Sequence, residues 1–215
     1  MNILLVRHGE TEWNREGRYQ GRTDIPLSTE GQRQVAALSA RLAHLPIALA
    51  VASPLSRARQ TAEAILHGRA LALEFDSDLV EISHGAWEGQ LADEVAAAHS
   101  EMLGAWRNHP DRDVPAGPDA ETLGLVEARA WPVLERVTAR LGPDDTALVT
   151  AHDAVNRVLL CRLIGLPLSR VWTFRQAPAT LNVLSGRTLG ELQLVRLNDS
   201  EHVSPLLHEA QHRAL

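Results

Sequence analysis

Two apolar segments of this chain end in polar side chains that a hydrophobic core does not require. Residues 3–6 lead into Arg7 and His8, and residues 147–150 lead towards His152. Ligands of parallel α/β sheets bind at the carboxyl ends of the strands. We therefore expect Arg7, His8 and His152 to converge at one edge of a sheet.

The types of these residues indicate an anion site. A lone histidine after a strand is more often a hydrogen-bonded structural residue, so the prediction depends on the combination. Arg7, Arg57 and two histidines at one place would repel one another unless an anion lay among them. Phosphate is the natural occupant, because guanidinium groups bind its oxygens bidentately. A neutral imidazole there can attack phosphorus directly and form a phosphohistidine, with no metal required.

A phosphoryl transfer of this kind also needs a proton for the leaving oxygen. Glu81 follows a short apolar stretch, Leu79-Val80, that resembles a strand. It is our candidate for the general acid and, in the second step, for the base that activates water. The structural alternative is a solvated glutamate at a strand end, which is common.

Composition narrows the chemistry further. The 215 residues carry a formal net charge of −6, which gives no global field for nucleic acid or an anionic membrane. No lysine occurs, which excludes a Schiff-base lysine and the lysine-containing phosphate loop. The single cysteine, Cys161, permits no intrachain disulfide. The apolar amino-terminal stretch is too short for a signal peptide or membrane span, and we expect a cytoplasmic protein with no membrane partner.

The remaining pattern indicates an α/β protein with one domain over residues 1–215. Short apolar runs at 3–6, 48–52 and 147–150 alternate with helical spacing. One predicted helix begins after Ser28, and a second runs from Leu123 to Leu141. We also expect a hairpin made of strands at 181–184 and 191–197 joined by a turn at 186–190. A separate loop is expected at 109–119, near the mouth of the site.

Several sequence blocks, in order along most of the chain, resemble the histidine phosphatase superfamily of phosphoglycerate-mutase-like proteins. The blocks are residues 4–14 (LLVRHGETEWN), 20–28 (QGRTDIPLS) with Gly31, 53–62 (SPLSRARQTA), Glu81 with 85–89 (GAWEG), Glu121-Thr122, and His152. The resemblance implies a three-layer α/β sandwich whose mostly parallel central sheet is flanked by helices. It also implies a metal-independent phosphatase without cofactor, acting on a small phosphorylated substrate.

The resemblance assigns roles residue by residue. His8 takes the phosphoryl group, Glu81 is the proton donor, and the phosphoryl oxygens are held by Arg7, Arg57 and His152. Asn14 adds a phosphate or nucleophile contact. The wall for the rest of the substrate would be formed by Gln20, Gly21 and Thr23. His84 is a candidate contact for a substrate carboxylate, and the carboxy-terminal histidines, His202, His208 and His212, are candidates for covering the mouth.

The chain departs from the family pattern at two places. After His152 the family usually has glycine, whereas this chain has Asp153, which we expect to cap the helix that follows. The usual Gly-Gly-Glu-Ser reads Asp119-Ala120-Glu121-Thr122 here, which keeps the carboxylate and the hydroxyl.

Four readings of function stay open at this point. We favour hydrolysis over a cofactor-dependent phosphoglycerate mutase, because the stretch from Trp87 to Leu123 is modest in length and mutases carry extra segments that enclose the substrate. Phosphoserine, phosphoglycerate, sugar phosphates and cobalamin-pathway nucleotides are all candidate substrates. Asp76 and Asp78 fit the pattern of a Mg²⁺-dependent aspartyl phosphatase, although no lysine is available for its later motif. A non-catalytic phospho-ligand-binding module would lack part of the catalytic set, which is complete here. A homodimer is expected only from the base rate for proteins of this size.

Overall fold

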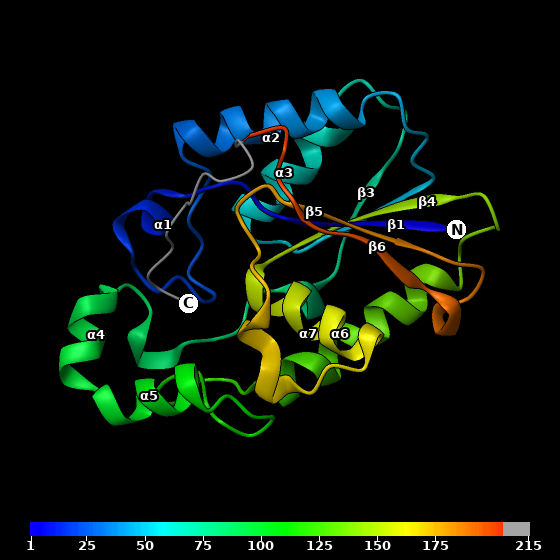
Figure 1. The fold of residues 1–215 in the computed structure, drawn as a ribbon. Helices are drawn as coiled ribbons and strands as arrows, with labels where there is room; N and C mark the ends of the chain where they lie inside the picture. Colours follow the sequence, from blue (N-terminus) through cyan, green and yellow to red (C-terminus); the bar gives the residue numbers. More distant parts are fainter. Residues whose placement is uncertain (204–215) are drawn as a thin grey trace.

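The computed structural model describes residues 1–203 and contains a six-stranded sheet at its centre (Figure 1). The strands are β1 (Asn2–Arg7), β2 (Leu49–Ala52), β3 (Leu73–Phe75), β4 (Thr146–Ala151), β5 (Leu181–Ser185) and β6 (Gln193–Asp199). Their order across the sheet is β3-β2-β4-β1-β5-β6. The three predicted core strands are confirmed and lie side by side as β2, β4 and β1.

The sheet is mostly parallel, as expected. β1 pairs in parallel with β4, β4 with β2, and β2 with β3, whereas β5 runs antiparallel to both β1 and β6. Every residue of β2 and β4 is buried, which is typical of parallel strands covered on both faces. The carboxyl ends of β1 and β4 therefore meet at one edge, and the first residues beyond them are His8 and His152.

Two pairs of helices cover the two faces of this sheet (Figure 1). The pairs are α2 (Thr29–Leu42) with α3 (Ser56–Leu66), and α6 (Leu123–Thr138) with α7 (Asp153–Ile164). Alternate β1 side chains divide between them: Leu4 and Val6 pack with the α2 and α3 cluster, and Ile3 and Leu5 with the α6 and α7 cluster. This alternation follows from the two-residue period of a strand. The three-layer prediction is confirmed.

The predicted helices are present, with one end misplaced. Ser28 accepts a hydrogen bond from the Gly31 N–H and so begins α2. Thr122 does the same for α6 through the Leu125 N–H. We expected α6 to continue to Leu141, but it ends at Thr138. The Leu141 N–H bonds three residues back, to the Thr138 carbonyl, because the last turn tightens before Gly142.

The remaining elements are short and connect the layers. They are α1 (Glu12–Glu16), α4 (Ala92–Ala98), α5 (Ser100–Asn108), and the 3₁₀ turns η1 (Ser77–Leu79), η2 (Gly85–Trp87), η3 (Leu168–Thr173) and η4 (Leu189–Glu191). Residues 109–119 form the predicted loop, and β5 and β6 form the predicted hairpin, with η4 inside its turn. Across residues 1–203, no helix has the length and apolar character needed to cross a membrane.

Candidate active site

The two histidines expected to converge lie together at the carboxyl edge of the sheet. Parallel pairing of β1 with β4 sets Arg7 opposite Ala151, so His8 and His152 become neighbours. Their ring centroids are 5.1 Å apart in an edge-to-face arrangement. Both side chains are almost fully buried, His8 at 2% exposure and His152 at 0%.

Backbone contacts fix His8 on both sides. Its N–H donates to the Ala151 carbonyl at 3.1 Å, and its own carbonyl accepts from the Ala179 N–H at 2.9 Å. The ring Nδ1 lies 2.7 Å from the Gly9 carbonyl, which can only accept. Nδ1 therefore carries a proton, so Nε2 is the nitrogen that bears the lone pair in the neutral form of this ring.

His152 is held from the other side of the site. Its Nε2 lies 2.8 Å from the Ser53 hydroxyl, and its Nδ1 is buried with no hydrogen-bond partner in the described part of the chain. Burial, followed by the charges of Arg57 and of His8, lowers the pKa of His152 well below its ordinary value. Its buried surroundings thus favour the neutral form of His152.

Arg57 comes from the first turn of α3 and is fully buried. Its Nη1 donates to the Thr23 carbonyl at 2.9 Å and its Nη2 to the Gly21 carbonyl at 2.7 Å, while Nε has no partner among residues 1–203. Burial lowers its pKa to about 10, which still leaves it charged at neutral pH. Two backbone carbonyls therefore orient this guanidinium.

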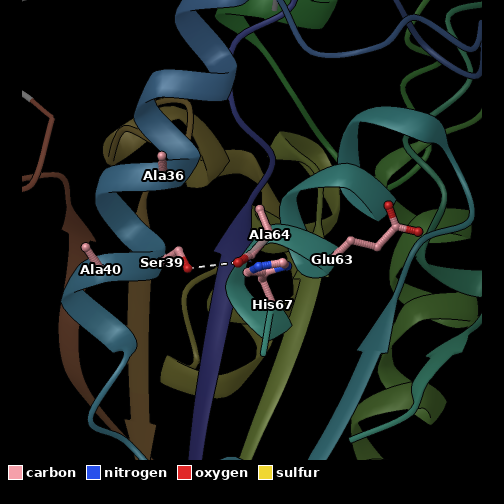
Figure 2. Close-up of a pocket in the computed structure, with 6 residues that line it drawn as sticks. All are labelled: Ala36, Ser39, Ala40, Glu63, Ala64 and His67. Carbon is pink, nitrogen blue, oxygen red and sulfur yellow. Dashed lines mark hydrogen bonds between the residues drawn. The ribbon is translucent and has the colours of Figure 1, made fainter. Parts of the chain in front are cut away.

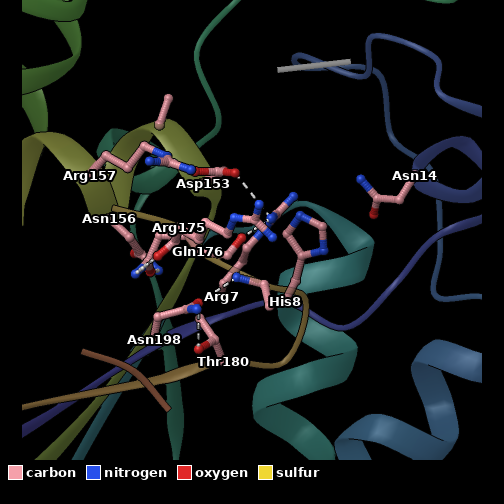
Figure 3. A network of polar contacts seen from close by, with 12 residues as sticks. Arg7, His8, Asn14, Asp153, Asn156, Arg157, Arg175, Gln176, Thr180 and Asn198 are labelled. Atoms are coloured by element: carbon pink, nitrogen blue, oxygen red, sulfur yellow. Dashed lines mark hydrogen bonds and ion pairs between the residues drawn. The ribbon is translucent and has the colours of Figure 1, made fainter. Parts of the chain in front are cut away.

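Arg7, the last residue of β1, is the second buried guanidinium. Its Nη1 donates to the Gln176 carbonyl and lies 3.0 Å from a carboxylate oxygen of Asp153 (Figure 3). Its Nε is buried and, within the described chain, has no hydrogen-bond partner. Burial lowers the pKa of Arg7, and the neighbouring Asp153 opposes that effect.

The predicted substrate wall contains the two carbonyl groups, of Gly21 and Thr23, that accept hydrogen bonds from Arg57. Gly21 adopts φ of +52°, a left-handed conformation that favours glycine, and a Cβ there would collide with the Glu88 carboxylate. The Thr23 N–H and hydroxyl donate to Glu88 at 3.1 and 2.9 Å. Arg57 and Glu88 therefore both hold residues 21–23 in place.

Two further predicted residues, Asn14 and Gln20, accept hydrogen bonds from Thr11, the residue that caps the amino terminus of α1. The Asn14 Oδ1 accepts from the Thr11 N–H at 3.1 Å in a capping box, and the Gln20 Oε1 accepts from the Thr11 hydroxyl at 2.9 Å. Figure 3 shows the Asn14 amide extending from α1 towards His8.

The Glu81 side chain contacts the amino terminus of α7, and 5% of the Glu81 surface is exposed. One carboxyl oxygen accepts from the Ile82 N–H at 2.9 Å, and the other from the Asp153 N–H at 3.0 Å. Burial raises the pKa of Glu81 and the Asp153 charge adds to that effect, while the two site arginines, Arg7 and Arg57, oppose it. A raised pKa suits a proton donor. The expected strand before Glu81 is wrong: the preceding residues form the 3₁₀ turn η1, which Asp76 caps through its side chain.

His84, the predicted contact for a substrate carboxylate, is almost fully buried. Its Nδ1 bonds the Ala116 carbonyl at 2.8 Å, its ring packs edge-on to Tyr19 at 4.9 Å, and only 1% of its surface is exposed. Its contact with a substrate carboxylate stays a prediction. In the tail, His202 bonds the Ala179 carbonyl at 2.9 Å, and the predicted roles of His208 and His212 lie outside the described residues.

Asp153 does not cap α7, contrary to expectation. The cap is His152, whose side chain makes no capping bond, and Asp153 is the first helical residue. Its carboxylate instead pairs with Arg7 and, one helical turn on, with Arg157. The i, i+4 spacing of Asp153 and Arg157 is readable in the sequence. The approach of Arg7 from β1 is not.

The second departure from the family pattern, residues 119–122, keeps a carboxylate and a hydroxyl that both make hydrogen bonds in the structure. Asp119 takes φ of +56°, where the family pattern has glycine. Glu121 accepts from the Ser83 N–H at 3.1 Å and pairs with Arg129, which also donates to the Glu81 carbonyl at 3.2 Å. Sequence reasoning assigned no role to Arg129, which lies far from the other site residues in the chain. It also assigned none to Glu88, although Glu88 follows His84 by four residues.

The acidic pair of the metal-dependent alternative is engaged elsewhere. Asp76 accepts from Arg136 at 2.7 Å, and Asp78 lies 3.5 Å from the same guanidinium. No group of three or more potential metal-binding side chains occurs within residues 1–203.

A separate hollow between α2 and α3 is lined by Ala36, Ser39, Ala40, Glu63, Ala64 and His67, none of which is a predicted site residue (Figure 2).

Comparison with known proteins gives concordant matches over nearly the whole chain. A family model described as the histidine phosphatase superfamily (branch 1) matches residues 3–200. The chain is 32% identical over 215 residues to phosphoserine phosphatase 1 of Hydrogenobacter thermophilus, covering 100% of both proteins. It is 32% identical over 205 residues to the adenosylcobalamin/alpha-ribazole phosphatase of Escherichia coli, covering 88% of this chain and 98% of that protein.

The fold is matched equally well among solved structures. YhfR of Bacillus stearothermophilus superposes with a TM-score of 0.87 at 27% identity, covering 94% of this chain and 99% of that chain. The sequence and structural matches therefore agree with the three-layer α/β fold described above.

Proposed function

Because this chain belongs to the histidine phosphatase superfamily, we propose that it hydrolyses a small phosphomonoester without a metal ion, through a phosphohistidine on His8. The relatives described above are named as phosphatases of small metabolites, which supports hydrolysis as the reaction class. We propose one catalytic domain over residues 1–215.

One observation carries the proposal: buried polar atoms around His8 lack partners within the described chain. They are the Nε atoms of Arg7 and Arg57 and the Nδ1 of His152. Buried donors left unsatisfied cost free energy, and they are rare except where a ligand completes them. Two guanidiniums and two imidazoles at the edge of one sheet favour a dianionic group such as a phosphoryl group. Their fixed charge supplies the stabilisation that a metal ion would otherwise provide.

The first step transfers the phosphoryl group to the enzyme. The Nε2 lone pair of His8 attacks phosphorus in line with the ester oxygen, an N–P bond forms, and the P–O bond breaks. Glu81, whose raised pKa favours the protonated form, donates its proton to the departing oxygen. Arg7, Arg57 and His152 hold the non-bridging oxygens through both steps.

The second step returns the enzyme to its starting state. Glu81, now ionised, takes a proton from water as the water oxygen attacks phosphorus. The N–P bond breaks, its electron pair returns to Nε2, and inorganic phosphate leaves. The same carboxyl group therefore acts as acid and then as base, as microscopic reversibility requires for a shared site.

The wall of the site frames the substrate class. Asn14, Gln20, Gly21 and Thr23 are proposed to contact the leaving group. His84 is the proposed contact for a carboxylate. Phosphoserine and alpha-ribazole phosphate follow from the relatives, and phosphoglycerates and sugar phosphates complete the panel to be tested.

The test is hydrolysis of para-nitrophenyl phosphate in excess EDTA by the wild type and by folded His8→Ala. Activity that persists in EDTA and is lost in the variant supports the proposal. Loss of wild-type activity in EDTA contradicts metal independence and points to Asp76 and Asp78. An inactive wild type that transfers phosphate between phosphoglycerates supports the mutase alternative, and binding of phosphate with neither activity supports a non-catalytic module.

Two further proposals concern the environment of the protein. We propose a cytoplasmic location and a homodimer. Cell fractionation and light scattering with size-exclusion chromatography test them; an extracytoplasmic or a monomeric protein contradicts the respective proposal.

A further inference from the structure

Asp153 is a buried charge that the proposed reaction does not use. It is the first residue of α7 and is 1% exposed. One carboxylate oxygen lies 3.0 Å from Arg7 Nη1, and the other accepts from Arg157 Nε. The resemblance leads us to expect glycine here, so this carboxylate is a feature of the present chain. Burying it is costly unless its partners are fixed.

Arg157 is fixed firmly. It is 7% exposed, and its Nη1 donates to the carbonyls of Val171 (3.1 Å) and Phe174. Its guanidinium also lies over the Trp172 ring, 5.1 Å from the centroid. Because Arg157 is itself held by these contacts, it gives the Asp153 carboxylate a partner in a fixed position.

Asp153 also touches Glu81 directly. Its backbone N–H donates to a Glu81 carboxyl oxygen at 3.0 Å. The Asp153 carboxylate therefore belongs to a residue whose backbone is in direct contact with the proposed acid. A negative charge beside a buried carboxyl group disfavours its ionised form. The backbone of Asp153 positions Glu81, and its side chain supplies the charge.

We propose that Asp153 is a positioning residue that keeps Glu81 in its proton-donating form, with Arg7 and Arg157 holding the Asp153 carboxylate in place. The inference rests on the proposed phosphatase function and adds a residue to it. With glycine at this position, Arg7 and Arg157 would lie near each other without the carboxylate between them, and Glu81 would lose its anionic neighbour.

The charges facing Glu81 act in both directions. Asp153 on α7 raises the pKa of Glu81, in addition to burial, whereas Arg57 on α3 and Arg7 on β1 lower it. Arg129 on α6 contacts the Glu81 backbone carbonyl, through a hydrogen bond of 3.2 Å. Removing the Asp153 charge leaves burial alone to oppose the arginines and the hydrogen bond from the Ile82 N–H, so the Glu81 proton is lost at lower pH.

The experiment compares the wild type with Asp153→Asn and with the control Asp144→Asn. Asp144 is exposed in the turn before β4, at the opposite end of the strand that leads to His152. Both variants remove one aspartate charge, and only the first does so beside Glu81. The measurement is kcat/KM against pH for an alkyl phosphate and for para-nitrophenyl phosphate.

The expected result for Asp153→Asn is a shift of the alkaline limb to lower pH. On that limb its loss on the alkyl substrate should exceed its loss on the aryl substrate by about tenfold, because the aryl leaving group needs little protonation. Asp144→Asn should match the wild type. If Asp153→Asn does not fold, Asp153→Gly is measured, and the same shift is expected.

Other outcomes separate the two proposals. An unshifted limb, or equal losses on both substrates, in a folded Asp153 variant overturns the positioning role while leaving the phosphatase proposal intact. A wild type without phosphatase activity contradicts the proposed function itself, together with this inference.

Discussion

Replacing Glu81 by glutamine tests the assignment of the general acid. Glutamine has nearly the same shape, so it can keep one hydrogen bond as acceptor, from Ile82 or from Asp153. Its amide nitrogen then faces the other backbone N–H, where the two donors cannot bond. The variant has no proton to give to a leaving oxygen.

The size of the effect follows from the role of the proton. General acid catalysis contributes about 10²- to 10⁴-fold, so kcat/KM for an alkyl phosphate, which reports the first step without the hydrolysis of the phosphohistidine, should fall by that factor, or about 3 to 5 kcal/mol in activation free energy. For para-nitrophenyl phosphate the fall should be below about tenfold, because its phenolate leaves with little protonation. Steady-state kinetics on both substrates measure the two losses.

A matched control separates this effect from a general loss of carboxylates. Glu74→Gln makes the same change at an exposed site on β3, where Glu74 pairs with Arg140. This variant should retain wild-type kinetics on both substrates. Equal losses on alkyl and aryl phosphates in Glu81→Gln would refute the role of Glu81 as the acid.

The stability of the same variant should depend on pH in a defined direction. Burial raises the pKa of Glu81 in the folded protein, so in the window between the unfolded and folded pKa values the folded state retains a proton that the unfolded chain has lost. Wild-type stability from this group is therefore present at low pH and is lost as pH rises through the folded pKa. Thermal unfolding should show Glu81→Gln below the wild type in acid, with the gap narrowing towards neutral pH; a gap that widens contradicts the raised pKa.

Three further changes have defined outcomes. Arg57→Lys cannot donate to the Thr23 and Gly21 carbonyls together and should lower kcat/KM for para-nitrophenyl phosphate by about 10²-fold or more, and near-normal kinetics would contradict its role. Leu38→Ala removes a fully buried side chain of α2 and should cost about 2 to 5 kcal/mol in urea unfolding, with kcat of the folded fraction unchanged; a loss below 1 kcal/mol would contradict its packing. Thr122→Ala removes the cap of α6 and should cost about 1 kcal/mol in the same assay, whereas Thr122→Ser should restore it.

The sequence carried most of the fold because its signals were local. Residues 3–6 form an unbroken apolar run flanked by polar groups, and all four are buried, as a central parallel strand requires. Ser28 and Thr122 mark helix starts through hydroxyls that bond backbone N–H groups. By contrast β3 is three residues long and partly exposed, so no apolar run marks it.

The candidate site was predictable where the residue types themselves carry chemistry. The sequence placed His8 and His152 together, because both follow strands that pair in parallel. It could not show that Asp153 pairs with Arg7, since that contact joins the ends of two separate elements. Nor could it show that His84 is closed in by Tyr19, because this burial depends on how the segment after β3 packs.

Trapping the phosphoenzyme tests the central claim most directly. After brief incubation with a ³²P-labelled substrate and a denaturing quench, the protein is kept at alkaline pH, where a phosphoramidate survives, and digested with trypsin. Because the chain has no lysine, cleavage follows arginine alone, so His8 lies on peptide 8–15 and His152 on peptide 141–157. We predict a base-stable, acid-labile label on peptide 8–15; label on any other peptide, or acid-stable label, would contradict the phosphohistidine route through His8.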